Sequence, residues 1–446
     1  MRVDVRAGGA LVSVLAATLG LLETQRDTGA PLDAILNRHA RTNKIAQADR
    51  MQISALLDDC SKSSMRLDHR LGAAGVEPAP RSRLLASLKL NSEMAATDIA
   101  VLTAAADVPA LTADEATWLD ALSPPLENDG MNLRTRLECP EWAWPHFEAA
   151  FGDRVEPELR ALLETPPLDL RVNTLKTTRD DALDAIRAAG FAAEPTPYSP
   201  VGIRLAERSI PLGTIPGLLE GAVDPQDEGS QLVALLVGAR PGEVVADYCA
   251  GSGGKTLALA AEMDNRGRLV AMDIDDARLG RSAPRHTKAG VDNVQRHLIV
   301  TDGKDAWLKR RKRSFDRVLV DAPCSGVGAW RRNPDARGGA GRKTRPLDEL
   351  LPVQADVLQR AARLCRPGGT LVYATCSLLG AENDDQVAAF LASDDGADFE
   401  LRPPEEFHVP LDGDVLRLTP ARHGCDGFFA AVLQRKEGGW SRRSRS

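Results

Sequence analysis

The 446-residue chain is poor in aromatic residues and has no cysteine pair at metal-binding spacing. Phe, Trp and Tyr together make up 4% of the residues. The 7 cysteines are scattered and form no C-x-x-C pair; they are Cys60, Cys139, Cys249, Cys324, Cys365, Cys376 and Cys425. This spacing argues against a disulfide framework and a zinc site, and it fits a reducing compartment. We therefore expect a cytoplasmic protein without a bound metal.

Long hydrophobic runs are also scarce. The apolar stretch from Ala10 to Leu22 follows Arg2 and Arg6, but it is too short to span a bilayer. The charged segment "ETQRD" comes directly after it, which suits the first helix of a globular domain better than a signal peptide. We expect no membrane partner. With 43% hydrophobic residues, the chain is long enough for two or three domains with real cores.

An overall positive charge is missing, since the net charge is −7, and this by itself argues against binding to nucleic acid. The charge is unevenly distributed, however. Residues 301–346 hold 13 Lys and Arg against 5 Asp and Glu. One part of this excess is the run "KRRKR" (Lys309–Arg313), which is either a solvated face or a contact for a polyanion. The other part is a cluster made of Arg331, Arg332, Arg337, Arg342, Lys343 and Arg345.

The texture of the sequence predicts three folded regions and a tail. Long Ala/Leu runs with a period near 3.6 predict an all-helical domain, and "SPPLENDG" (Ser123–Gly130) reads as a linker. Strand-like pieces around one helix then predict a small α+β module. Strands alternating with helices follow. The predicted boundaries are 1–125 for the helical domain, 136–225 for the α+β module, 226–436 for the third domain and 437–446 for a disordered basic tail.

The third region predicts an α/β domain with a doubly wound, parallel, Rossmann-like sheet. Its expected strands are residues 243–248, 268–275, 294–302, 315–323 and 370–377. Ligands of such sheets bind at the carboxyl ends of the strands. Two cysteines follow such strand ends, Cys324 in "DAPCSGVG" and Cys376 in "YATCSL".

A glycine-rich turn, "CAGSGGKT" (Cys249–Thr256), follows the first of these strands. A Walker loop requires glycine where Cys249 stands, and a dinucleotide loop requires glycine where Thr256 stands, so both patterns fail. S-adenosylmethionine carries no phosphates and fits a short turn of this kind. Asp273, at the end of the next strand, would accept hydrogen bonds from its ribose. NAD-type binding and a plain tight turn are the alternatives.

A thiol beside a methyl donor suits one reaction in particular. Carbon 5 of cytosine is a poor nucleophile until a thiolate adds to carbon 6, which is covalent catalysis. A second thiol would assist the departure of the first, and Asp321 would hydrogen-bond the N3 or N4 edge of the ring. Nitrogen and oxygen acceptors need no such thiol, and an amino-group methyltransferase would have a DPPY-like turn at "DAPC". The motifs contain no histidine, so a carboxylate, a thiolate or water must remove the carbon 5 proton.

The target base must leave its stack to reach such a pocket. The arginines after "PCSGVGAW" would then hold the phosphates on either side of that base. Trp330 either stacks on RNA or packs in the protein core. The other cysteines (Cys60, Cys139, Cys365 and Cys425) are expected to be buried apolar residues.

These motifs resemble those of the Nop/Sun-type RNA (cytosine-5) methyltransferases, nearest to the bacterial RsmB branch. The matching blocks include "DYCAGSGGKT", "VAMDID", "DAPCSGVGAWRRNPD" and "LVYATCSLLGAEN", with "LRVNTLK" and "VDPQDEGSQL" upstream and "DGFFAAVLQR" downstream. The resemblance implies that Cys376 is the nucleophile and that Cys324 promotes product release. It implies that S-adenosylmethionine contacts Cys249, Ala250, Gly251, Ser252, Gly253, Gly254, Lys255, Asp273, Asp302 and Asp321. One departure is Gly251-Ser252, where the family usually has Ala-Pro.

The helical N-terminal region is similar to the antitermination-factor-like RNA-binding domain of RsmB proteins, best in "QADRMQISALL". This similarity implies a folded RNA substrate, which we expect to be small-subunit ribosomal RNA bound by a monomer. Several alternatives stay open. They are a transfer RNA substrate, a methyltransferase for protein or small molecules, a non-catalytic RNA-binding protein of ribosome assembly, and a generic helical bundle in place of the RNA-binding domain.

Overall fold

The computed structural model describes residues 8–207, 210–300, 305–337 and 345–438. The chain forms two compact units. The first consists of Met1–Thr165 and Trp330–Thr344, and the second of Pro166–Ala329 and Arg345–Ser446. Most of the predicted tail, from residue 439 onward, and the predicted site residue Asp302 lie outside the described residues.

The first unit is helical. Its core contains Leu15, Ile53, Leu85 and Ile99, which are at most 2% exposed. The elements are α1 (Gly8–Thr28), α2 (Leu32–Thr42), α3 (Gln47–Lys62), α4 (Ser64–Ala73), α5 (Pro80–Leu90), α6 (Ala96–Ala105), α7 (Ala113–Ala121), α8 (Leu133–Arg136), α9 (Trp144–Phe151), η1 (Gly152–Arg154), α10 (Val155–Ala161) and η4 (Pro334–Ala336).

The helical region extends further than the 1–125 that the sequence predicts. Helices α8 to α10 occupy much of residues 133–161, where we expected the α+β module to begin, and the first strand begins only at Leu168. Phe147 and Leu159 are buried, and Pro166 and Pro167 follow the last helix. Helices α8 to α10 thus contribute buried apolar residues to the helical unit. The two prolines that follow disfavour a further helix, and the strands begin after them.

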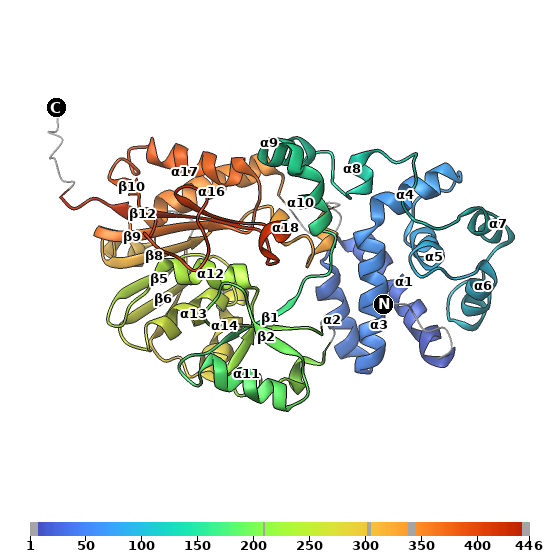
Figure 1. Cartoon of the computed structure of the whole chain (residues 1–446), viewed down its shortest axis with the longest axis horizontal. Helices are drawn as coiled ribbons and strands as arrows, with labels where there is room; N and C mark the ends of the chain where they lie inside the picture. The colour runs from blue at the N-terminus through green and yellow to red at the C-terminus, as the bar shows by residue number, and fades with distance from the viewer. Residues whose placement is uncertain (1–7, 208–209, 301–304, 338–344, 439–446) are drawn as a thin grey trace. The chain divides into compact units, whose positions relative to one another are not determined.

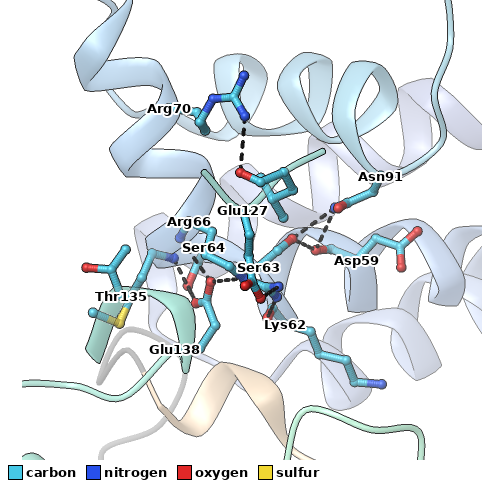
Figure 2. A network of polar contacts seen from close by, with 12 residues as sticks. Asp59, Lys62, Ser63, Ser64, Arg66, Arg70, Asn91, Glu127, Thr135 and Glu138 are labelled. Carbon is cyan, nitrogen blue, oxygen red and sulfur yellow. Dashed lines mark hydrogen bonds and ion pairs between the residues drawn. The ribbon is translucent and has the colours of Figure 1, made fainter. Parts of the chain in front are cut away.

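A buried carboxylate holds the start of α4 (Figure 2). Glu138 is 1% exposed, and its carboxylate accepts hydrogen bonds from the backbone N–H groups of Met65 at 2.8 Å and Arg66 at 2.9 Å. The Nε of Arg66 donates to the same carboxylate at 2.9 Å. The first N–H groups of a helix have no partner within it, and negative charge is favourable there. Burial raises the pKa of Glu138, although Arg66 opposes this.

The predicted linker at residues 123–130 is tied to the same helix. The guanidinium of Arg70, which is 8% exposed, donates hydrogen bonds to the carbonyl oxygens of Ser123, Pro125 and Leu126. Carbonyl groups at a turn need donors when they are shielded from water. The segment is therefore part of the folded helical unit.

The second unit begins with a small antiparallel sheet of order β2-β3-β1-β4. Leu170, Ile186, Ile203 and Val223 form its buried core with one helix. A small α+β module is therefore present, and its strands lie between Leu168 and Pro225, within the predicted range 136–225. Its elements are β1 (Leu168–Val172), α11 (Arg179–Ala188), β2 (Ala193–Pro195), β3 (Gly202–Leu205), η2 (Leu212–Thr214) and β4 (Val223–Pro225).

The large sheet of this unit has the order β10-β12-β9-β8-β5-β6-β7, with β11 paired to β12. Strands β9, β8, β5, β6 and β7 are parallel, which confirms the predicted doubly wound sheet. The strands are β5 (Val244–Asp247), β6 (Arg268–Asp273), β7 (Val294–Leu298), β8 (Phe315–Asp321), β9 (Cys365–Thr375), β10 (Phe399–Leu401), β11 (Val415–Leu418) and β12 (Phe428–Arg435).

Helices cover both faces of this sheet, as Figure 1 shows for α16 and α17 on one side and α12 to α14 on the other. Strand β5 lies between β6 and β8, so the chain changes direction across the sheet beside it. Ligands bind at such a switch point. The helices are α12 (Glu228–Val237), α13 (Gly254–Glu262), α14 (Asp276–Ala289), α15 (Ala306–Arg310), η3 (Val327–Ala329), α16 (Leu347–Ala362), η5 (Gly380–Glu382), α17 (Asp384–Leu391) and α18 (Pro420–His423).

None of the helices in the described residues has the length and apolar character needed to cross a membrane. Within the same residues, no three His, Cys, Asp or Glu side chains come together in a way that would hold a metal ion.

Candidate active site

The glycine turn joins β5 to α13 and is fixed to the end of β6. Gly251 and Gly253 have φ values of 55° and 84°, which favour glycine. A Cβ atom on Gly251 would lie 2.5 Å from Nη2 of Arg278. Asp273 accepts hydrogen bonds from the backbone N–H groups of Gly251 and Asp275, each at 2.8 Å. The sequence-predicted turn and its acidic partner therefore form one structural unit.

Asp247, the last residue of β5, is a site residue that the sequence analysis did not single out. It is 1% exposed, and its Oδ2 accepts a hydrogen bond from Thr256 Oγ1 at 2.6 Å. Among the described residues, its Oδ1 has no hydrogen-bond partner. Burial raises the pKa of Asp247 to about 7, against the effect of the Thr256 hydrogen bond. An acidic residue ending the strand before the glycine turn was the signal available in the sequence.

These residues fit S-adenosylmethionine. The buried Oδ1 of Asp247 is an acceptor without a donor, and each Asp273 oxygen keeps a second lone pair. A ligand with ammonium and hydroxyl donors satisfies such acceptors. A Cβ atom on Gly254 would come no closer than 3.9 Å to another residue, Gln226, so the turn leaves open space beside the backbone.

The two predicted active-site cysteines are neighbours. Cys324 follows β8 and Cys376 follows β9, and these strands are adjacent and parallel. Their Sγ atoms lie 3.4 Å apart. The hydrogen bond to Cys376, together with burial, raises the pKa of Cys324 well above the usual value, so this group remains a thiol at neutral pH. The loops are joined by a hydrogen bond from Gly328 N to the Cys376 carbonyl at 3.0 Å.

Lys255, the lysine of the glycine turn, points to the cysteine end of the site. Its Nζ donates a hydrogen bond to Asp321 Oδ2 at 2.8 Å. Burial lowers the pKa of Lys255, but Asp321, Cys376 and Asp247 together raise it by more, so the net shift is upward. The ammonium group therefore stays charged close to both Asp321 and Cys376.

Glu382, in η5, links the two cysteine loops and was not assigned a role from the sequence. Its side chain is fully buried. The carboxylate accepts hydrogen bonds from Ser325 N at 2.7 Å, Ser325 Oγ at 2.5 Å, Gln354 Nε2 at 2.9 Å and the hydroxyl of Ser377. Ser325 and Ser377 directly follow Cys324 and Cys376. The only sequence signal was the position of Glu382 in the quoted block "LVYATCSLLGAEN".

Further hydrogen bonds fix the residues around Glu382. The hydroxyl of Tyr373 donates to the Glu382 carbonyl at 2.7 Å. Thr375 Oγ1 donates to Asn383 Oδ1 at 2.5 Å, and Asn383 Nδ2 donates to the Ser377 carbonyl at 3.0 Å. The carboxyl end of β9 is therefore fixed by hydrogen bonds to Glu382 and Asn383 as well as by its pairing in the sheet.

Two of the six basic residues in the cluster after the Pro-Cys motif are buried, so these two are not placed to contact RNA phosphates as the sequence suggested. Arg331 and Arg337 are 3% and 4% exposed, and Arg337 donates a hydrogen bond to the Leu162 carbonyl. Trp330 is 1% exposed, with its ring 5.6 Å from that of Phe147, so it packs in the core. Arg342 and Lys343 lie outside the described residues, while Arg332 and Arg345 are exposed.

The remaining four cysteines expected to be structural are buried, which confirms that prediction. Burial raises the pKa values of Cys60, Cys139 and Cys365 to about 12. The reactive thiols are therefore to be sought at the strand ends, where Cys249, Cys324 and Cys376 are only partly buried.

The doubly wound sheet, the glycine turn at its switch point and the acidic residues ending β5 and β6 define an S-adenosylmethionine-dependent methyltransferase. Comparison with known proteins agrees. The family described as 16S rRNA methyltransferase RsmB/F matches residues 234–434, and the RsmF/B-like ferredoxin-like domain matches residues 139–210.

Named relatives cover most of the chain. The ribosomal RNA small subunit methyltransferase B of Salmonella typhi is 36% identical over 315 residues, 70% of each chain. The probable enzyme of the same name from Synechocystis is 32% identical over 314 residues, again 70% of each chain. The chain therefore belongs to the RsmB/F methyltransferase family.

Solved structures support the same fold. The methyltransferase homolog protein from Pyrococcus horikoshii matches 68% of this chain and 97% of its own with a TM-score of 0.58 and 27% identity. The crystal structure of PH0851 covers 98% of this chain and 100% of its own, with a TM-score of 0.74 and 24% identity. This second likeness shows that the fold extends through the helical unit.

Proposed function

We propose that this protein is an RNA cytosine-C5 methyltransferase that acts on small-subunit ribosomal RNA. The observation that carries the proposal is the pair of thiols 3.4 Å apart at the carboxyl ends of β8 and β9, beside the Lys255–Asp321 ion pair. The substrate follows from the relatives, which are named ribosomal RNA small subunit methyltransferase B. The helical unit, proposed to be the antitermination-factor-like domain, would help to bind this RNA.

In the first step, the Cys376 thiolate forms a bond to carbon 6 of cytosine. The Lys255 ammonium, paired with Asp321, lies close to Cys376 at this end of the site. The same ammonium faces negative charge that develops on the ring, and the Asp321 carboxylate accepts a hydrogen bond from the exocyclic amino group. Carbon 5 thereby gains the electron density that it lacks in free cytosine.

S-adenosylmethionine bound at the glycine turn supplies an electrophilic methyl group. After a base removes the carbon 5 proton, the bond between Cys376 and carbon 6 breaks and its electron pair returns to sulfur. Cys324 remains a thiol because its pKa is raised, so it can donate a hydrogen bond or proton to the departing sulfur 3.4 Å away. Cys376 thus makes the covalent bond, and Cys324 helps to break it.

Replacing each cysteine separately tests this division of roles. We expect Cys376→Ala to abolish methyl transfer and to form no adduct. We expect Cys324→Ala to accumulate a protein–RNA adduct that survives a denaturing gel, because release is slowed. Cys60→Ala, a buried thiol in the helical unit, is the control and should retain activity. An adduct with Cys376→Ala, or none with Cys324→Ala, would contradict the assignment.

Bisulfite mapping of cellular RNA with and without the protein tests the substrate. We expect one or a few cytosines of small-subunit ribosomal RNA to lose protection when the protein is missing. A loss of methylation confined to transfer RNA would support the proposed reaction but would identify transfer RNA as the substrate. If purified protein bound RNA tightly but formed no 5-methylcytosine, a non-catalytic role in ribosome assembly would explain the data better.

A further inference from the structure

A compact group of cations lies on the second unit, away from both cysteine motifs in the sequence. It consists of Arg268, Lys309, Arg310, Arg311 and Lys312, which we call the α15 surface. All of these except the half-buried Arg311 are exposed. Arg268 begins β6, and the other four end α15 or follow it. Burial lowers the pKa of Arg311, and the charges of Arg268 and Arg310 lower it further, so these three cations lie close together.

The cations of this surface lack the acidic partners that several arginines elsewhere in the unit have. In the described residues, none of the five takes part in an ion pair. Other exposed arginines of the same unit do so, for example Arg363 with Asp395 at 2.8 Å and Arg366 with Asp316 at 2.6 Å. The chain as a whole has more acidic than basic residues, 63 against 56. Unpaired cations in such a chain indicate a partner that brings its own negative charge.

A stack of three side chains holds one of these cations in place. The ring of Trp307 lies against the ring of His297, with centroids 4.2 Å apart and planes 17° apart. The guanidinium of Arg311 lies 3.8 Å from the Trp307 ring centroid on this stack. Asp305 fixes the base of the stack, since its Oδ2 lies 2.9 Å from His297 Nε2 and its Oδ1 caps α15 at Leu308 N. Stacking immobilises a guanidinium and leaves the N–H groups at its edge free to bind an anion.

We propose that the α15 surface binds the phosphate backbone of duplex RNA outside the target-base site. This inference rests on the proposed RNA substrate and adds a second point of contact to it. Phosphate groups match both the unpaired lysines and a fixed guanidinium, which bonds phosphate in two-pronged geometry. Such contacts carry no sequence information, but they fix the orientation of the enzyme on a folded RNA.

Salt-dependent binding of a fluorescein-labelled 20-base-pair RNA duplex tests the proposal with the full-length protein. The variant Lys309→Ala/Arg310→Ala/Lys312→Ala removes three charges and leaves the stack intact. We expect at least a tenfold loss of affinity at 0.1 M salt, and a slope of log Kd against log salt that is lower by about 2. The matched control, Arg266→Ala/Arg363→Ala/Arg366→Ala, removes three exposed cations that have acidic partners and should bind nearly as the wild type does.

Arg311→Ala alone tests the stacked guanidinium, with about a threefold to tenfold loss of affinity expected. Unchanged affinity and salt slope in the triple variant would overturn the proposal. So would equal competition by a poly-glutamate of matched charge, which would identify an acidic protein as the partner. Failure of the proposed function is separate, because it would show as absence of 5-methylcytosine with the wild-type protein, whether or not this surface binds RNA.

Discussion

Each half of the site contains one buried carboxylate, and the two carboxylates differ in how many hydrogen-bond donors surround them. At the ends of β5 and β6, Asp247 receives one hydrogen bond from Thr256, and its other oxygen has no partner among the described residues. At the ends of β8 and β9, Glu382 receives hydrogen bonds from Ser325, Ser377 and Gln354. Asp247 and Glu382 are almost equally buried, at 1% and 0% exposure.

This difference distinguishes a carboxylate that binds a ligand from a carboxylate that positions neighbouring protein groups. A buried acceptor without a donor costs free energy until a ligand supplies one. A carboxylate surrounded by donors instead holds the groups that carry them. The β5–β6 half is therefore built to receive S-adenosylmethionine, and the β8–β9 half is built to keep two thiols in contact. Mutations in the two halves should affect different measurable quantities.

Among the carboxylates of the site, the largest effect on kcat is expected from Glu382→Gln, which replaces an acceptor oxygen by an amide NH2 group facing donors. The loops that carry Cys324 and Cys376 would shift relative to each other, and a displacement near 1 Å can lower a rate about 100-fold. We expect kcat to fall by about that factor, while S-adenosylmethionine affinity, measured by calorimetry, changes little.

Glu400→Gln, an exposed carboxylate on β10 of the same sheet, is the matched control and should keep full activity. A kcat for Glu382→Gln within twofold of the wild type would show that the cysteine loops do not depend on this residue.

A smaller effect, on the other half, is expected from Asp273→Asn. This change weakens the acceptors that hold the Gly251 N–H and are available to a ribose. S-adenosylmethionine should bind about tenfold more weakly, or about 1.4 kcal/mol, with kcat at saturation nearly unchanged. Asp276→Asn, on the exposed first turn of α14, serves as the control. A loss of kcat without a change in affinity would place Asp273 in the chemical step.

An effect of a different kind, on stability, is expected from Asp247→Asn in the protein without cofactor. The pKa of Asp247 is about 7 in the folded state and near 3.9 in the unfolded state. Between these values the unfolded carboxyl loses its proton while the folded one keeps it, so the wild type loses stability as pH rises toward 7. The asparagine side chain does not ionise, so the stability of the variant has no such dependence on pH.

The Tm of Asp247→Asn minus that of the wild type should therefore rise by about 5 °C between pH 4 and pH 7 and then stay level. Scanning calorimetry at several pH values measures this difference. The same scan on Asp264→Asn, an exposed carboxylate, should show no such trend. A difference that does not depend on pH would mean that Asp247 ionises normally in the folded protein.

Much of the catalytic unit could be predicted from local sequence patterns. Apolar runs alternating with helical periods indicated the parallel sheet, and the carboxyl ends of parallel strands meet at one edge. Cys324 and Cys376 were therefore expected near each other, as their 3.4 Å separation confirms. The antiparallel strand β12 was not predicted, because the run "FFAAVLQR" does not reveal the direction in which a strand pairs.

The burial of the segment that follows Cys324 could not be predicted. In the sequence Arg337 looks like an RNA contact, because it is a basic residue beside a reactive motif, while Trp330 fits either stacking on RNA or packing in the core. In the structure this segment belongs to the compact helical unit, where Trp330 packs on Phe147 and Arg337 bonds to a carbonyl. Which unit a segment joins depends on contacts between residues far apart in the chain, which leave no local pattern.

Local sequence patterns were enough to specify the class of fold, the glycine turn and the positions of the two thiols, because these follow from spacing along single strands and turns. The contacts between distant elements establish which carboxylate keeps an acceptor without a donor and which is surrounded by donors. Asp247 and Glu382 are alike as acidic residues near a motif. Their partners come from separate elements of the chain, and it is these partners that set the charge and hydrogen bonding of a buried group.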